Sequence, residues 1–152
     1  MANPTHEQAK LHLQVFEERR EPRLRQAREW FFKNYHVTSV DDAMRIAAPG
    51  TENGALAMMV ISYWEQTCAL LNYGLLHEDL FFETDGEFFG VYDRVKPTLE
   101  EGRKRFSNKL FLANLEKAAT RFESWMEQRS PGAIAAMRNM QQQFRKQAGK
   151  AA

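Results

Sequence analysis

The sequence predicts an all-α protein, a compact multi-helix bundle with two long central helices near residues 52–73 and 107–129. Three observations indicate this class. Apolar residues recur at helical spacing through most of the chain, no segment alternates in the manner of a strand, and the few glycines and prolines fall between the periodic segments. The 152 residues fit one domain of ordinary size. We therefore expect a single helical domain over residues 1–152.

The first helical segment is predicted to begin at Asn3-Pro4 and to reach Tyr35. Asparagine favours the N-cap position, and proline favours the first helical position. Pro22 interrupts the segment, because proline lacks a backbone donor and its ring clashes with the carbonyl four residues earlier. We expect a kink or a break at Pro22.

Two capped helices are expected next. Residues 39–42, Ser-Val-Asp-Asp, resemble a capping box and predict a short helix that ends near Ala48. Thr51 or Asn53 then caps the first long central helix. Gly74 stands where a left-handed C-terminal cap is typical.

The following segment, residues 75–96, is aromatic and acidic, and Asp85-Gly86 predicts a turn between two short helices. Pro97 or Thr98 is expected to begin another helical turn. From Ser107 to about Arg129 the apolar residues follow a heptad seam, which predicts the second long central helix.

The last helix is predicted to begin after Ser130-Pro131. Its apolar side carries Ile134, Met137, Met140 and Phe144. An apolar stripe on a terminal helix must dock on its own core or on a partner, and methionines suit adaptable contacts. We therefore expect this helix to help form a homodimer.

Charge is unevenly distributed along a chain whose net charge is only +1. Residues 46–93 contain eight acids and no Lys or Arg, whereas residues 94–152 contain thirteen Lys or Arg and five acids. Either the two parts face each other in the fold, or the basic part binds an acidic partner. Nucleic acid is not favoured as that partner, because glutamates interrupt the basic residues.

No catalytic, cofactor-binding or metal-binding residues are predicted. The histidines stand in neither an E-x-x-H nor an H-E-x-x-H pattern, the acids between 78 and 93 fail the spacing of a calcium loop, and no glycine-rich phosphate motif is present. Cys68 is alone, so it cannot form an internal disulfide, and its apolar neighbours predict burial. The polar N-terminus and the short apolar run 55–61 predict a cytoplasmic protein without a membrane span.

Glu65 is unusual because it lies beside the apolar face of a helix that offers it no Lys or Arg. Arg103 comes from the next segment, and its planar guanidinium can hold a carboxylate with two hydrogen bonds. We expect a partly buried Glu65–Arg103 ion pair that sets the register of the helices. The alternatives are a solvent-facing Glu65 and a general base in a pocket.

The chain resembles a bacterial family of small helical proteins that is catalogued as a domain of unknown function. The residues that carry the resemblance, within 55–125, are Trp64-Glu65, the segment 72–82 (NYGLLHEDLFF), Tyr92, and Pro97 with Arg103 six residues on. The resemblance implies an all-helical fold and no activity. Some similar proteins begin with a membrane helix, but the charged N-terminal segment here does not match one.

Together these observations favour a non-enzymatic interaction module or a self-associating protein. The alternative is a small-molecule binding protein or an enzyme whose pocket lies among the aromatic residues of 80–92.

Overall fold

The computed structural model describes residues 2–151, which form eight helices and no strand, so the predicted all-α class is confirmed. The chain divides into two compact units, Met1–Ala119 and Thr120–Ala152. A single domain over residues 1–152 stays a prediction. The helices are α1 (His6–Arg19), α2 (Pro22–Asn34), α3 (Val40–Ile46), α4 (Glu52–Asn72), α5 (Glu78–Thr84), α6 (Glu87–Arg105), α7 (Ala113–Arg129) and α8 (Ala133–Ala151).

The helical segment of residues 3–35 is two helices, and the predicted break at Pro22 is confirmed, since α2 begins at that proline. The start of α1 was placed too early. Its N-cap is Thr5, whose hydroxyl accepts from the Gln8 backbone while the Gln8 side chain accepts from the Thr5 backbone. This reciprocal capping satisfies two otherwise free donors and therefore sets the start at His6 rather than Pro4.

The predicted ends of α3 and α4 are largely confirmed. Ser39 and Thr51 are the N-caps, and Gly74 follows α4 with a φ of 74°, the left-handed conformation that glycine adopts without strain. Gly54 has a different role. A Cβ there would lie 2.1 Å from the Ala48 carbonyl oxygen, so the loop after α3 passes against α4 only because residue 54 is glycine.

A long helix, α6, replaces the short helix and separate turn expected around Pro97. The helix runs from Glu87 to Arg105 with Pro97 inside it. Proline removes one backbone hydrogen bond from a helix, yet Pro97 is exposed, while Val95 and Leu99 on either side of it are buried. Burial of this apolar face stabilises the helix across the lost hydrogen bond.

The predicted second long helix, 107–129, starts too early by six residues. Residues 106–112 form turns, Ser107 and Leu112 both have a φ of 52°, and α7 begins at Ala113. A left-handed residue cannot continue an α-helix, so the apolar residues before Leu112 belong to a loop, in which Leu110 is exposed and Phe111 is half-buried.

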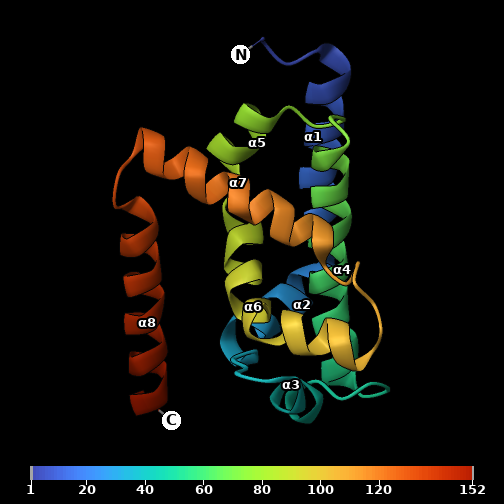
Figure 1. Ribbon diagram of the computed structural model, residues 1–152, viewed down its shortest axis with the longest axis vertical. Coiled ribbons are helices and arrows are strands. Elements are labelled where there is room, and N and C mark those ends of the chain that lie inside the picture. Colours follow the sequence, from blue (N-terminus) through green and yellow to red (C-terminus); the bar gives the residue numbers. More distant parts are fainter. Residues whose placement is uncertain (1, 152) are drawn as a thin grey trace. The chain divides into compact units, whose positions relative to one another are not determined.

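The core of the first unit is built on α4. This helix packs against α2 and α6, α3 packs against α6, and Figure 1 shows α3 near one end of the α4–α6 pair. Trp64 of α4 is fully buried beside Phe88 of α6, with their ring centroids 6.3 Å apart. Phe88 also stacks on Phe82 at 5.9 Å and lies 5.2 Å from Phe81. Cys68 is buried, as expected.

The arginine–carboxylate cluster, Arg19, Arg28, Asp85 and Glu87, ties α1 and α2 to the start of α6. The Arg28 guanidinium donates to both carboxylate oxygens of Glu87, at 2.6 and 2.5 Å. The Trp64 indole N–H donates to the same carboxylate at 3.3 Å. Arg19 lies 3.6 Å from Asp85. These four side chains are only 12–21% exposed, so their mutual neutralisation matters to the fold.

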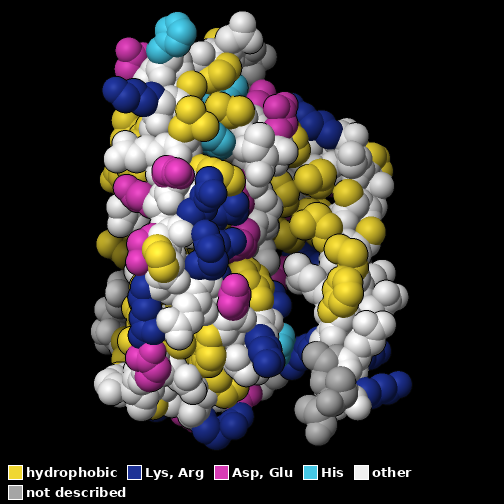
Figure 2. Space-filling view, turned by 180° about the vertical axis from the view of Figure 1, so that it is seen from behind, with side chains coloured by type: hydrophobic (Ala, Val, Ile, Leu, Met, Phe, Trp, Pro, Cys, Tyr) yellow, Lys and Arg dark blue, Asp and Glu magenta, His cyan; other side chains and the backbone are white. Residues whose placement is uncertain are grey.

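Acidic residues of the segment 46–93 therefore pair with arginines of the N-terminal helices α1 and α2, and not only with basic residues after position 94. Arg23 of α2 adds a further pair, with Glu52. Basic residues after position 94 include Arg103 and Lys104, which pair with the nearby Glu116 and Glu100. On the face shown in Figure 2, basic and acidic side chains are interleaved.

The second unit contains the end of α7 and all of α8. Arg138 of α8 donates to Glu123 of α7 at 2.9 Å, and the Arg129 guanidinium lies 4.3 Å from the centre of the Trp125 ring. Gly132 makes the turn between the helices with a φ of 84°. Along α8, Ile134 is buried, whereas Met140 and Phe144 are exposed.

Candidate functional site

An apolar cleft of about 310 Å³ is a candidate site, and it lies wholly in the first unit. Its walls come from the end of α2, from α3 and the loop after it, from one face of α4, and from α6 with the turns that follow. The lining residues are Tyr35, Val40, Ala43, Met44, Ala47, Pro49, Gly54, Ala57, Met58, Ile61, Thr98, Gly102, Phe106 and Phe111.

Polar contacts outside the cleft hold α3 in place as one wall. The Glu101 carboxylate accepts from the Val40 backbone N–H at 3.3 Å, and Arg105 donates to Asp41 at 2.6 Å. Both contacts join α3 to α6. On the opposite side, the close approach at Gly54 brings the loop after α3 against α4. The cleft is thus formed by the packing of helices and does not depend on a ligand.

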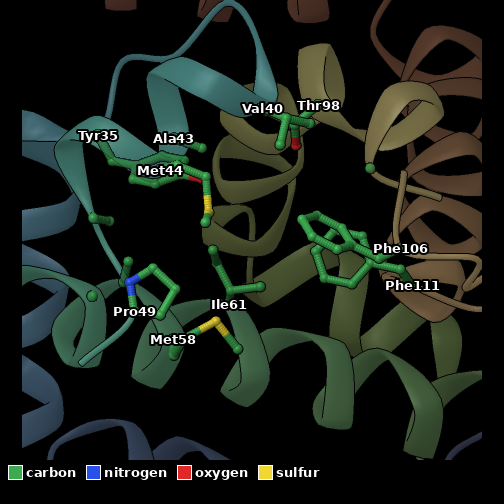
Figure 3. Close-up of a pocket in the computed structure, with 14 residues that line it drawn as sticks. Tyr35, Val40, Ala43, Met44, Pro49, Met58, Ile61, Thr98, Phe106 and Phe111 are labelled. Carbon is green, nitrogen blue, oxygen red and sulfur yellow. The ribbon is translucent and has the colours of Figure 1, made fainter. Parts of the chain in front are cut away.

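The side chains of the cleft are exposed at its mouth and buried in its interior. Met44, Met58 and Phe106 are 39–57% exposed, whereas Val40 and Ile61 are buried. Figure 3 shows Met44 and Ile61 pointing toward each other, with Phe106 beside Phe111. Methionine adapts its shape to a neighbour, so the mouth can adjust to a guest.

Only two side chains in the cleft carry a polar group. The Thr98 hydroxyl donates to the Val95 carbonyl at 2.7 Å and is thereby satisfied. Within the described part of the chain, no residue forms a hydrogen bond with the Tyr35 hydroxyl. Tyr35 is buried, and burial raises the pKa of its phenol, so the hydroxyl stays protonated. It remains available as a donor and an acceptor.

The lining of the cleft carries no Asp, Glu, His, Lys, Arg, Cys or Ser. Tyr35 and Thr98 are the lining residues with a group capable of acid–base or nucleophilic chemistry, and the Thr98 hydroxyl already donates to a backbone carbonyl. The cleft can hold an apolar molecule and offer it one hydrogen bond.

The alternative pocket among the aromatic residues of 80–92 does not match this cleft. Phe82, Phe88 and Phe89 are buried, and Phe82 and Phe88 stack in the core. Phe81, from the same segment, lines a smaller pocket beside His12. The residues of the cleft were missed because no local motif joins segments that are as far apart as Tyr35 and Phe111.

Glu65 and Arg103 do not pair, so the predicted ion pair is wrong. The Glu65 carboxylate accepts from the backbone N–H groups of Asn114 and Leu115, at 3.1 and 2.8 Å, and from the Asn114 side chain at 3.0 Å. Arg103 donates to the Phe111 carbonyl at 3.0 Å and meets Glu116 at 2.5 Å. The free N–H groups at the start of α7 need an acceptor, and Glu65 supplies it.

The described residues hold no group of three or more His, Cys, Asp or Glu side chains that could bind a metal ion. None of their helices combines the length and the apolar composition needed to cross a bilayer.

A family model described as a domain of unknown function, DUF4760, matches residues 4–122. The chain belongs to this family. The match spans every residue that lines the cleft and most of the first unit. It confirms the family resemblance that the residues between 55 and 125 predicted. No curated protein and no solved structure matches the chain.

Proposed function

We propose that this DUF4760 protein is a non-enzymatic binding protein whose cleft holds a small apolar molecule. The observation that carries this proposal is a cleft of about 310 Å³ whose lining is apolar except for two hydroxyl groups. Ligand sites in proteins usually measure roughly 300–1,000 Å³ and place a few polar groups in an apolar wall. The cleft matches the lower end of that range.

The Tyr35 hydroxyl defines what else the ligand carries. The Tyr35 side chain is buried and its hydroxyl has no hydrogen bond to the described residues, so a ligand atom that accepts or donates one hydrogen bond can bind it. We therefore propose a largely hydrocarbon ligand with a single polar group. A strongly charged ligand is disfavoured, because the cleft offers no opposite charge.

Binding of a neutral apolar fluorophore, N-phenyl-1-naphthylamine, tests the cleft. We expect saturable fluorescence enhancement with the wild-type protein. Ala43→Trp fills the cleft from α3 and should abolish the enhancement, whereas Ala135→Trp, at an exposed position of α8 away from the cleft lining, should leave it intact. Gly102→Ala is a milder variant, since its Cβ would meet Phe111 and Val40 at an ordinary 3.8 Å.

Two outcomes would contradict the proposal. Equal binding by Ala43→Trp and the wild type would place the fluorophore elsewhere, and no saturable binding by a folded wild type would remove the cleft as a site. Tyr35→Phe separates the two parts of the ligand hypothesis. This variant should bind a pure hydrocarbon with unchanged affinity and should bind an alcohol of the same chain length more weakly than the wild type does.

Self-association through α8 is the second candidate function, supported by the exposure of its apolar side. Met140 is 52% exposed and Phe144 64% exposed, on a helix that also carries the buried Ile134. An exposed aromatic and methionine stripe suits a contact with a second copy of the chain. We expect a homodimer in solution at micromolar concentration.

Light scattering on the full chain and on a chain that ends at Arg129 tests self-association. The full chain should have the mass of a dimer, and the shortened chain that of a monomer. Met140→Gln/Phe144→Gln keeps the helix and removes its apolar stripe, so it should also be monomeric. A full chain with the mass of a monomer rules the dimer out.

A further inference from the structure

A second, smaller pocket of about 220 Å³ lies between α1 and the end of α5, and it differs from the cleft in carrying ionisable groups. Its polar side chains are His12, Thr84 and Asp85, and its apolar walls include Leu13, Phe16 and Phe81. Leu13 and Phe16 are exposed, whereas Phe81 is buried. The pocket thus has an open apolar side and a polar end.

Hydrogen-bond directions show which polar atoms are acceptors. The Thr84 hydroxyl donates its proton to the Leu80 carbonyl at 2.7 Å. His12 Nε2 lies 3.2 Å from the same hydroxyl oxygen, so the imidazole must be the donor in that contact. Burial lowers the pKa of His12 and favours its neutral form, in which Nδ1 is then an acceptor. Thr84 is consequently not activated as a nucleophile.

Asp85 is the less well paired acid of the arginine–carboxylate cluster. Glu87 has two short hydrogen bonds from Arg28 and one from Trp64. Asp85 accepts from the Glu87 backbone N–H at 3.1 Å, and its closest cation is Arg19 at 3.6 Å, beyond the length of a good hydrogen bond. Its side chain is 12% exposed. The pocket therefore ends in a desolvated carboxylate with an unfilled acceptor position.

From this geometry we propose that the second pocket binds a small organic amine, with its ammonium on Asp85 and its apolar body between Leu13, Phe16 and Phe81. An ammonium supplies donors that the Asp85 carboxylate can accept. None of the lining side chains is a Lys or Arg, and the nearest cation, Arg19, already faces Asp85 and Glu87, so an anion would be repelled by the Asp85 charge. A metal ion would find fewer ligands than it needs, since the described residues hold no group of three or more suitable side chains.

The charges around Asp85 determine how pH affects binding. They are Arg19 and His12 from α1, Arg28 from α2, Tyr63 from α4 and Glu87 from α6. Burial raises the pKa of Asp85 to about 6. An ammonium pairs with the charged carboxylate, so affinity should be highest above pH 6 and should fall as Asp85 is protonated.

Calorimetric titration of the full chain with 2-phenylethylamine tests the proposal, with 2-phenylethanol and 3-phenylpropionate as neutral and anionic ligands of similar shape. We expect the amine to bind at pH 7.5 at least about tenfold more tightly than either, which is the usual effect of one charge-assisted hydrogen bond. Asp85→Asn should remove this preference. Glu83→Gln removes an equal charge at an exposed neighbouring position outside the pocket and should leave binding unchanged.

The pocket and the cleft are tested independently. Ala43→Trp, which fills the cleft, should bind the amine as the wild type does, so the failure of one proposal does not affect the other. Absence of amine binding at millimolar concentrations, equal binding of the alcohol, or an unchanged affinity in Asp85→Asn would each overturn the amine site.

Discussion

Glu65→Gln is expected to lower the free energy of unfolding by about 2–3 kcal/mol. The half-buried Glu65 carboxylate accepts three hydrogen bonds at the start of α7, two of them from backbone N–H groups. Glutamine keeps one acceptor oxygen and turns an N–H₂ group toward donors, which leaves a backbone N–H unsatisfied. Urea denaturation at pH 7.5 measures the loss, and Glu83→Gln, at an exposed site, should change the stability by less than about 0.5 kcal/mol.

A double substitution distinguishes this cap from the ion pair that the sequence favoured. If Glu65 and Arg103 neutralised each other, Arg103→Met in the Glu65→Gln background would recover part of the lost stability. Because Arg103 instead contacts Phe111 and Glu116, we expect the double variant to be less stable than either single variant. A recovery in the double variant would show that the two charges are coupled.

Asp85→Asn is expected to change the pH dependence of stability by about 2–3 kcal/mol. Burial raises the pKa of Asp85 from 3.8 to about 6 in the folded protein. The folded state therefore binds this proton more tightly than the unfolded state does. The contribution of Asp85 to stability is lowest above pH 6, rises as the pH falls through 6, and is complete below 3.8.

The measurement compares the wild type with Asp85→Asn at pH 7.5, 6.0 and 4.5. The variant should be relatively more stable at pH 7.5, and this advantage should shrink by about two-thirds by pH 4.5. The comparison largely cancels the contributions of His12 and Asp42 to the pH dependence of stability, because both proteins carry these residues. The lowered pKa of His12 acts in the opposite direction to that of Asp85. The pKa of Asp42 is about 2 because Thr38 and Arg45 hold its carboxylate by hydrogen bonds. A difference between the two proteins that stays constant with pH would show that Asp85 is not buried as a charge.

Caps and breaks were predictable from the chain alone because they depend on neighbouring residues. Pro22 separates two helices, Ser39 and Thr51 begin helices, and Gly74 ends one. In each case a residue acts on backbone groups no more than four positions away. The all-α class follows from the same local periodicity.

Two of the misplaced boundaries arose where the tertiary structure outweighed local preference. Pro97 lies within α6 because burial on the opposite face stabilises the helix around it. Residues 107–112 have helical apolar spacing, but they form a largely exposed loop that ends in the left-handed, buried Leu112. Phe111 in that loop lines the cleft instead of extending α7.

Helix positions along this chain could be predicted from residue types and spacing, whereas partners and binding sites could not. Glu65 lies 49 positions from the helix it caps, and the cleft joins side chains from Tyr35 to Phe111. Asp85 acquires its environment from Arg19 on another helix. Local periodicity carries no information about such distances, because helix formation is governed by near neighbours and side-chain partners by the packing of distant segments.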